Sequence, residues 1–332
     1  MNKVRVWIKN ARSTSLMQSV MPAILAVVMA FGSEDFSIWA SVVAVLGIVA
    51  AHLGMNLADD YFDYKVGTSE SRKHLVRQGF RARLVKYPYL TDGSASVNDL
   101  KKAIVSFLAV AAVLGLSIVL FSTYYVIPIV LITLFLGLFY SAAPLKLSYR
   151  GLGELVIGLI FGPLLMSGIY IASAGVFETS ILWISIPMGL LVTNILFTHS
   201  FIDQIADKAS GKVTLAVLIG NNKGNFVVSL LLNLLPFAMI VTVALLGYIS
   251  YWYLLCLLVL PRALWLLYSL KAFCEKKEVN TDRPAWFLGR MENWERIKQS
   301  GTEWFMIRWY CARNIISDFC LIIILIKILS YL

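Results

Sequence analysis

The chain has 332 residues, of which 59% are hydrophobic and 14% are charged, and its formal net charge is +10. This composition excludes a chain folded around a soluble core, because most of the length must lie in lipid. We expect an all-α, polytopic integral membrane protein that forms a single domain over residues 1–332.

Long apolar segments recur along the whole chain. A helix needs about 20 apolar residues to cross a hydrocarbon layer of about 30 Å. The short alternating strands of an outer-membrane barrel are not evident. Nine transmembrane helices are predicted, at 14–31, 38–57, 103–120, 124–140, 152–172, 181–201, 227–248, 252–270 and 315–332.

The basic residues are distributed on one side of these spans. Of the 29 lysines and arginines, 27 fall in the N-terminal arm and in every second loop. Short loops rich in lysine and arginine stay on the cytoplasmic side. We therefore expect a cytoplasmic N-terminus and a positive cytoplasmic face. Anionic lipid or an anionic substrate explains this charge better than nucleic acid, which we do not expect as a partner.

The first acidic cluster, NLADDYFDYKVG (56–67), follows the second predicted span. On a helix, Asn56, Asp60 and Asp63 share one face because they are four and three residues apart. Asp59 lies about 100° round the same helix. The cluster is predicted to lie at the cytoplasmic end of its helix.

The second acidic cluster lies in FIDQIADKASGKVTLAVLIG (201–220), at the cytoplasmic end of the sixth predicted span. Asp203 and Asp207 are four residues apart. Carboxylates at membrane depth are costly and like charges repel, so we expect a cation between the clusters. Oxygen ligands favour Mg²⁺, which proteins usually hold together with substrate phosphate oxygens. No histidine or cysteine stands within either cluster except His199, four residues before Asp203, so zinc and iron are poor candidates.

Basic residues accompany both clusters, and with Mg²⁺ they would stabilise a departing diphosphate. Two alternatives remain open. Acids at a membrane interface can simply be hydrated, and intramembrane carboxylates are also typical of cation-coupled transporters. The position at helix ends, beside basic loops, favours the diphosphate site. The predicted diphosphate-binding residues are Arg72, Arg77, Lys146, Arg150 and Lys212.

Together with YSAAPLKLSYRGLGEL (140–155), these clusters resemble the motifs of the UbiA superfamily of intramembrane prenyltransferases. Members carry NDxxDxxxD and DxxxD motifs on helices 2 and 6 of a nine-helix bundle. The resemblance spans residues 12–225 and is greatest to the 1,4-dihydroxy-2-naphthoate branch of menaquinone synthesis. Three positions depart from the pattern: Asp59 stands for Asn, Gly67 for the last Asp of the first motif, and Ile202 for an Arg.

The resemblance implies Mg²⁺-dependent transfer of a polyprenyl group from polyprenyl diphosphate to an aromatic acceptor, with decarboxylation if the acceptor is the naphthoate. Other acceptors of the superfamily are 4-hydroxybenzoate, homogentisate, haem and glycerophosphate. It also implies a UbiA-type bundle in the bacterial inner membrane, with its active site toward the cytoplasm. The implied residues are Asp60, Asp63, Asp203 and Asp207 for catalysis, the same four with Asn56 and Asp59 for metal binding, and Tyr140 and His199 for acceptor binding.

Residues 271–313 fall outside the usual pattern of the superfamily. They contain Trp286, Trp294, Trp304 and Trp309 among mixed charges. We expect one or two short helices along the cytoplasmic membrane interface, with tryptophans at headgroup depth. An interfacial anchor is favoured over a lid on the active site or a partner-binding segment.

Overall fold

The computed structural model describes residues 3–67 and 87–331, in which every regular element is a helix. In chain order the elements are α1 (Lys3–Asn10), η1 (Ser13–Leu16), α2 (Met17–Ala30), α3 (Ile38–Val66), α5 (Pro88–Thr91), α6 (Val97–Phe121), η2 (Tyr124–Val126), α7 (Ile127–Ser141), η3 (Leu147–Tyr149), α8 (Gly153–Leu159), η4 (Ile160–Leu164), α9 (Leu165–Ala174), α10 (Ser180–Ile202), α11 (Gln204–Ala209), α12 (Leu215–Ile219), α13 (Asn222–Leu245), η5 (Tyr251–Val259), α14 (Leu260–Cys274), η6 (Trp286–Leu288), α15 (Trp294–Gln299) and α16 (Glu303–Leu329).

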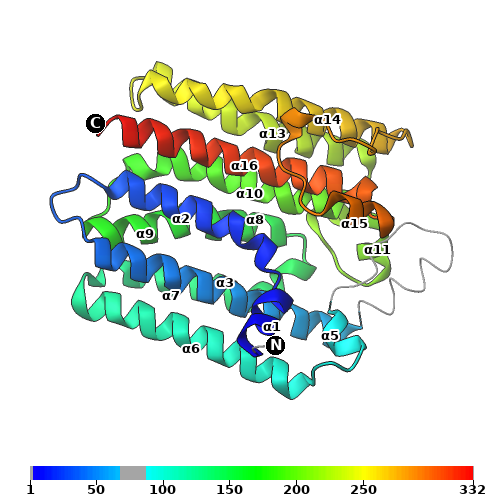
Figure 1. Cartoon of the computed structure of the whole chain (residues 1–332), viewed down its shortest axis with the longest axis horizontal. Coiled ribbons are helices and arrows are strands. Elements are labelled where there is room, and N and C mark those ends of the chain that lie inside the picture. Colours follow the sequence, from blue (N-terminus) through cyan, green and yellow to red (C-terminus); the bar gives the residue numbers. More distant parts are fainter. Residues whose placement is uncertain (1–2, 68–86, 332) are drawn as a thin grey trace.

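The long helices run side by side as one bundle (Figure 1). Within the described residues, eight helical stretches are long and apolar enough to cross a membrane, and they coincide with the first eight predicted spans. The chain is therefore an integral, multi-pass membrane protein. The ninth predicted span, 315–332, falls in α16, which packs in the bundle against α2 and α10. Along its whole length, α16 carries five charged residues, Glu303, Arg308, Arg313, Asp318 and Lys327.

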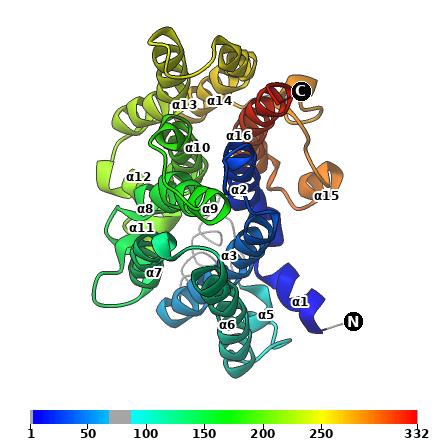
Figure 2. The same ribbon diagram turned by 90° about the vertical axis from the view of Figure 1, so that its left-hand side faces the viewer.

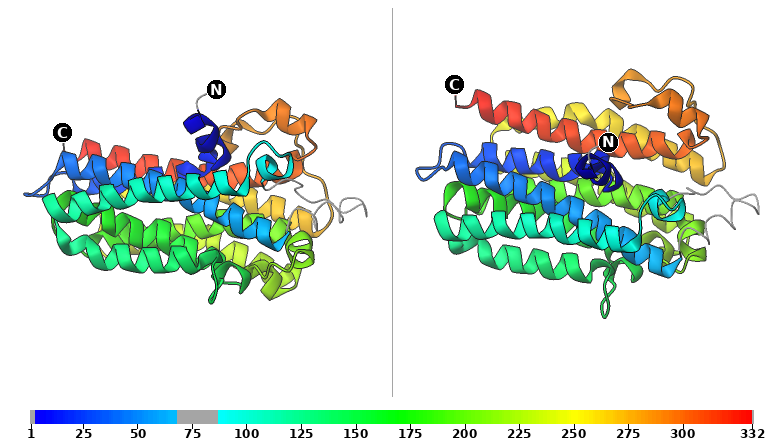
Figure 3. Two further views of the ribbon diagram at one scale, coloured as in Figure 1. Left: turned by 90° about the horizontal axis from the view of Figure 1, so that it is seen from below. Right: turned by 60° about the horizontal axis from the view of Figure 1, so that its bottom comes forward.

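Helix α10 lies at the centre of the packing. Seen end-on, it stands among α2, α8, α13 and α16 (Figure 2), and it contacts all four. Most of its side chains are buried, whereas those of α6 and α7 are largely exposed. Exposed apolar side chains on the outer helices are expected where lipid, rather than water, surrounds a bundle. Helix α1 lies outside the bundle (Figure 3).

Three glycines bring α8 and η4 close to α10. A Cβ atom on Gly162 would lie 2.4 Å from the Cα atom of Gly189, and one on Gly158 would lie 1.9 Å from the Oγ1 atom of Thr193. Small residues four apart allow such backbone approach in membrane helices. The chain is π-helical over η4, which contains Pro163. This close packing sets the loops before α8 and after α10 next to each other.

Helix α3 is longer than its predicted span. Ser37 caps its N-terminus by accepting a hydrogen bond from the backbone N–H of Ala40, and Gly67 ends it in the left-handed conformation, with φ of 75°. Glycine adopts this conformation without the steric cost of a Cβ atom. The whole first acidic cluster is therefore helical, and Gly67 terminates the helix where the superfamily motif has an acid.

The segment between α14 and α16 is shorter than the predicted 271–313, because α14 continues to Cys274 and α16 begins at Glu303. Its two short helices are η6 and α15. The tryptophans differ in their surroundings: Trp294 is buried, Trp286 is 91% exposed, and Trp304 lies in α16. That this segment lies at a cytoplasmic membrane interface stays a prediction.

Candidate active site

Both acidic clusters lie at the same end of the bundle, the acidic end, where α5, α11 and α15 also lie (Figure 1). Asp60 and Asp63 stand near the end of α3, and Asp203 and Asp207 stand at the end of α10 and in α11. None of the four side chains is more than 4% exposed. Buried carboxylates need cations or hydrogen-bond donors, so the partners of each define the site.

Among the described residues, Arg12 makes the shortest ion pairs with the first cluster. Its Nη2 atom lies 2.9 Å from Oδ1 of Asp60 and 3.2 Å from Oδ2 of Asp59, and it also donates to the backbone oxygen of Asn56 at 3.0 Å. From the sequence alone, Arg12 was only one of the basic residues of the N-terminal arm that indicate a cytoplasmic location. The sequence did contain a signal for this contact. Consecutive spans are antiparallel, so the start of the first span and the end of the second lie at the same depth in the membrane.

Asn56 and Tyr89 complete the surroundings of Asp60. The amide nitrogen of Asn56 donates to the backbone oxygen of Ala11 and to Oγ of Ser15, both at 3.0 Å, which fixes the turn that carries Arg12. The hydroxyl of Tyr89 donates to Oδ2 of Asp60 at 2.8 Å. Burial and the Asp60 carboxylate raise the pKa of Tyr89, so this hydroxyl remains a donor.

Asp63 and Asp59 connect the first cluster to the α7–α8 loop. The hydroxyl of Tyr149 donates to Oδ1 of Asp63 at 2.6 Å, and Oγ of Ser141 donates to Oδ1 of Asp59 at 3.0 Å. Burial and Asp63 raise the pKa of Tyr149. Two elements distant in sequence therefore supply neutral donors to one acidic helix end.

Lys212 connects the two clusters. Its Nζ atom lies 3.9 Å from Oδ1 of Asp63, and its backbone N–H donates to the backbone oxygen of Asp207 at 2.9 Å. Burial alone would lower the pKa of Lys212, but Asp63, Asp59 and Asp207 raise it well above its usual value. The amine is therefore charged. Of the predicted diphosphate-binding residues that the structure describes, Lys212 is the one that lies among the carboxylates.

The second cluster lies where the chain bends from α10 into α11. Asp203 stands between these helices, and the N–H of Asp207 donates to its backbone oxygen at 2.9 Å. Nε2 of His199 lies 3.3 Å from Oδ2 of Asp203, and its ring meets the ring of Phe305 edge to face at 5.0 Å. His199 is thus held between the second cluster and α16.

Glu154, which sequence reasoning quoted within a motif but did not assign, ties two loops together. Both oxygens of its buried carboxylate accept from the backbone N–H of Leu215, at 3.1 and 3.2 Å. The N–H of Gly151 also donates to the backbone oxygen of Val213 at 2.6 Å. These contacts hold the loop that carries Lys212 against the start of α8.

For the remaining predicted site residues, the structure gives less information on contacts with the acidic clusters. Lys146 and Arg150 are exposed, and Arg150 donates to the backbone oxygen of Pro144 at 3.2 Å. Tyr140 lies in the electrostatic neighbourhood of Lys212. The predicted diphosphate-binding residues Arg72 and Arg77 lie outside the described residues.

The metal-binding set predicted from the sequence fits Mg²⁺ in its donor chemistry. Within residues 3–67 and 87–331, no three His, Cys, Asp or Glu side chains converge closely enough to hold an ion by themselves. Five carboxylates, those of Asp59, Asp60, Asp63, Asp203 and Asp207, lie at this end of the bundle, with Arg12 and the buried Lys212 among them. Carboxylate oxygens are the donors that suit a hard divalent cation.

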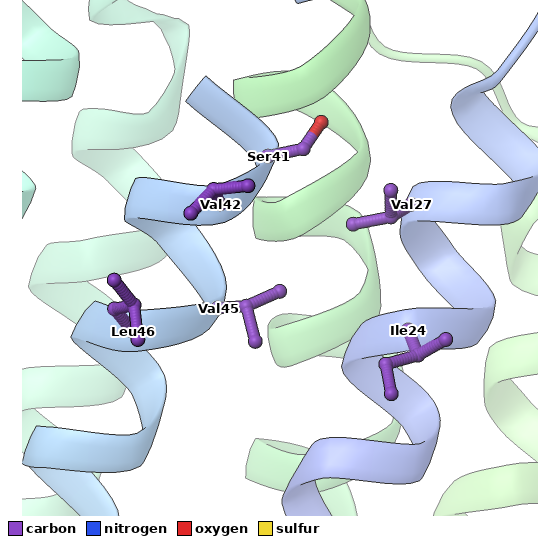
Figure 4. Close-up of a pocket in the computed structure, with 6 residues that line it drawn as sticks. All are labelled: Ile24, Val27, Ser41, Val42, Val45 and Leu46. Atoms are coloured by element: carbon purple, nitrogen blue, oxygen red, sulfur yellow. The ribbon is translucent and has the colours of Figure 1, made fainter. Parts of the chain in front are cut away.

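An apolar groove lies between α2 and α3, away from the acidic end. It has a volume of about 210 Å³, and its lining includes Ile24, Val27, Val42 and Val45 (Figure 4). Val45 is fifteen residues before Asp60 on α3, a distance of about 22 Å along the helix axis. The groove and the first acidic cluster therefore share helix α3.

The fold and the site together define a membrane protein whose two acidic clusters lie, with Arg12 and Lys212, at one end of a helical bundle. The model of the UbiA prenyltransferase family matches residues 19–289. The 2-carboxy-1,4-naphthoquinone phytyltransferase of Synechocystis is 26% identical over 234 residues, which are 68% of this chain and 70% of the relative.

A second relative is the 1,4-dihydroxy-2-naphthoate octaprenyltransferase of Bacillus subtilis. It is 27% identical over 216 residues, which are 63% of this chain and 64% of the relative. The solved structure of a UbiA homologue from Archaeoglobus fulgidus, bound to DMAPP and Mg²⁺, superimposes with a TM-score of 0.62 at 15% identity, covering 94% of this chain and 99% of that one. At that identity the likeness shows the fold.

The chain belongs to the UbiA prenyltransferase family, as its motifs predicted, and it is a prenyltransferase.

Proposed function

We propose that this enzyme transfers a polyprenyl group from its diphosphate to 1,4-dihydroxy-2-naphthoate with loss of the carboxylate, a step of menaquinone synthesis. The observation that carries the proposal is the pair of buried acidic clusters joined through Lys212. The naphthoate acceptor is supported by the names of relatives that are 26% and 27% identical. The A. fulgidus homologue, solved with DMAPP and Mg²⁺, supports a prenyl diphosphate and a metal as partners.

The residues have distinct roles in this proposal. Asp60, Asp63, Asp203 and Asp207 would hold Mg²⁺, which neutralises charge on the departing diphosphate. Lys212, already charged among these carboxylates, would contact the diphosphate as a fixed cation. We include Lys146, Arg150, Arg72 and Arg77 as further diphosphate-binding residues, and Asn56 and Asp59 as further metal-binding residues.

The reaction balances without a redox partner. The C–O bond of the allylic diphosphate breaks and its electron pair leaves with the diphosphate. The ring carbon that bears the carboxylate forms the new bond to the allylic carbon, and CO₂ leaves from that carbon. Tyr140 and His199, which lie close to Lys212 and Asp203, would bind and orient the aromatic acceptor.

We infer that the prenyl chain runs between α2 and α3 toward the apolar groove that contains Val45. Support comes from continuity, because α3 carries both Asp60 and the groove, and from the apolar lining. The groove is about 22 Å from Asp60 along the helix axis. A long polyprenyl chain would reach it, whereas a short one would end before it.

We also propose that α16 is a ninth transmembrane helix and that the acidic end faces the cytoplasm of a bacterial inner membrane. The 27 basic residues of the N-terminal arm and alternate loops support this orientation. Reporter fusions at residue 33 and at the C-terminus should report the outer side. A cytoplasmic signal from the C-terminal fusion would refute nine spans with this orientation.

The function is tested with purified full-length protein in detergent, an allylic diphosphate, Mg²⁺ and a panel of acceptors that includes 4-hydroxybenzoate, homogentisate, haem and a glycerophosphate. Mass spectrometry should find decarboxylated, prenylated naphthoate, and excess chelator should abolish its formation until Mg²⁺ is restored. Product from another acceptor alone would refute the naphthoate assignment. Undiminished turnover in chelator would refute the metal role. Product formation without a membrane gradient distinguishes an enzyme from a cation-coupled transporter.

A further inference from the structure

His52 is the only ionisable residue of α3 that precedes the first acidic cluster. It lies eight residues, about 12 Å along the helix axis, before Asp60 and inside the candidate span Ile38–Lys65. Its side chain is buried. An ionisable side chain within a membrane span is costly and needs defined polar partners. None of the roles proposed above uses His52, so its partners indicate what it does.

The polar partners of His52 are two serines at the start of the first span. Nε2 of His52 lies 3.2 Å from Oγ of Ser15, and Nδ1 lies 2.7 Å from Oγ of Ser19. The ring also packs against the ring of Phe161 in η4, with 4.8 Å between the centroids. Contacts from η1, α2 and η4 therefore fix the position of the imidazole.

The other hydrogen bonds of Ser15 determine which ring nitrogen of His52 carries a proton. Oγ of Ser15 donates to the backbone oxygen of Arg12 at 2.8 Å and accepts from the amide nitrogen of Asn56 at 3.0 Å. A hydroxyl has one proton and two lone pairs, so only a lone pair is left for His52. Nε2 therefore donates to Ser15, and in the neutral ring Nδ1 accepts from Ser19.

This chain of hydrogen bonds ends at the backbone of Arg12. Arg12 has a left-handed conformation, with φ of 57° and ψ of 49°, which is costly for a residue with a Cβ atom. Such a conformation persists where several neighbours hold it. The backbone oxygen of Arg12 accepts from both the N–H and the hydroxyl of Ser15, each at 2.8 Å. The bond from His52 fixes the direction of that hydroxyl.

We propose that His52 is a positioning residue, which acts through Ser15 on the turn that carries Arg12. By holding this turn, it keeps the guanidinium on the carboxylates of Asp59 and Asp60. Because the guanidinium occupies oxygens that the proposed metal ion requires, His52 sets the Mg²⁺ affinity of the site before substrate binds. This consequence for the metal rests on the proposed function, whereas the positioning of Arg12 does not.

Two matched variants of His52 test the contact with Ser15. His52→Gln places an amide nitrogen near the position of Nε2, whereas the side chain of His52→Asn is one methylene shorter and reaches only toward the position of Nδ1. Thermal-shift titrations of the full-length protein in detergent, without substrate, measure Mg²⁺ binding. His52→Gln should bind Mg²⁺ as the wild type does, and His52→Asn about threefold more tightly, because Arg12 is held less firmly. Equal affinities of the two variants would overturn the proposal.

The same pair in the Arg12→Gln background separates positioning from a general effect on structure. The difference between His52→Gln and His52→Asn should vanish there, because no guanidinium remains to be positioned. A difference that persists would overturn the proposal. Ser41→Ala is the control, since it removes a buried hydroxyl of the same helix that donates to Oγ of Ser173, and it should leave the Mg²⁺ affinity unchanged.

Melting temperatures without Mg²⁺ test the positioning role independently of the metal. His52→Asn should lower the melting temperature of the wild type more than that of Arg12→Gln, because the two side chains act through one turn. Equal lowering in both backgrounds would overturn the positioning role, whether or not the protein binds Mg²⁺. Failure of the proposed function has a different signature, which is the absence of prenylated product from the wild type.

Discussion

Arg12 offers the sharpest test of the acidic site, because it occupies carboxylate oxygens that the proposed metal ion requires. Its guanidinium contacts both Asp59 and Asp60, and its side chain is 39% exposed. Breaking a fully buried ion pair costs about 3–5 kcal/mol, and a surface pair contributes about 0–1 kcal/mol. A partly exposed pair lies between these limits, at about 2 kcal/mol.

Arg12→Gln should therefore have two opposite effects. Without Mg²⁺ it should lower stability by about 2 kcal/mol, because Asp60 loses its cation. With Mg²⁺ it should bind the ion more tightly, by about 10- to 30-fold, since no internal cation has to be displaced. Thermal-shift titrations with Mg²⁺ in the absence of substrate measure both effects on the same purified protein.

Two control variants separate charge from contact. Arg12→Lys keeps the charge without the planar guanidinium and should lie between the wild type and Arg12→Gln. Arg150→Gln removes an exposed arginine whose hydrogen bond goes to a backbone carbonyl, and it should leave the Mg²⁺ affinity unchanged in the absence of diphosphate. Unchanged or weaker Mg²⁺ binding by Arg12→Gln would show that Arg12 and the ion do not compete for Asp60.

Three other substitutions test separate parts of the site. Asp207→Asn should lower turnover by about 100-fold or more if the buried Asp207 holds the metal. Its control, Glu295→Gln at an exposed acid on α15, should leave turnover unchanged. If Asp207→Asn and the wild type give similar rates in product assays, Asp207 does not belong to the site. Glu154→Ala should lower turnover about 10-fold and raise KM for the diphosphate, because Glu154 anchors the loop that carries Lys212. An unchanged KM would contradict this positioning role. Val45→Trp should fill the apolar groove and reduce the rate with long but not with short prenyl diphosphates. Its control, Val105→Trp on an exposed helix face, should not change the relative rates with long and short chains. Equal rates of Val45→Trp with all chain lengths would refute the inferred path.

Much of the fold could be predicted from local sequence patterns. Apolar runs of membrane length identify spanning helices because the hydrocarbon layer leaves no other partner for backbone polar groups. Likewise, the spacing of Asn56, Asp60 and Asp63 requires a shared face once the segment is helical, and α3 extends far enough to include them. The placement of both acidic clusters at one end follows from the alternating direction of consecutive spans.

The partners of the carboxylates were decided by tertiary structure. Arg12, Tyr89 and Tyr149 reach the first cluster from three separate elements, and their hydrogen bonds join residues between 29 and 86 positions apart. The glycine packing of α8 against α10 and the bonds of Glu154 likewise depend on which helices become neighbours. Periodicity within one helix contains no information on such pairs.

The same division holds for the segment that follows α14. Its tryptophans and mixed charges indicated one or two short helices. Its position depends on hydrogen bonds from Arg262 and Asn314, which lie on two different helices. Hydropathy and helical spacing therefore determined which residues lie in lipid and which share a face. The folded bundle alone decided which charge meets which, because each such contact joins side chains from elements that are distant in the chain.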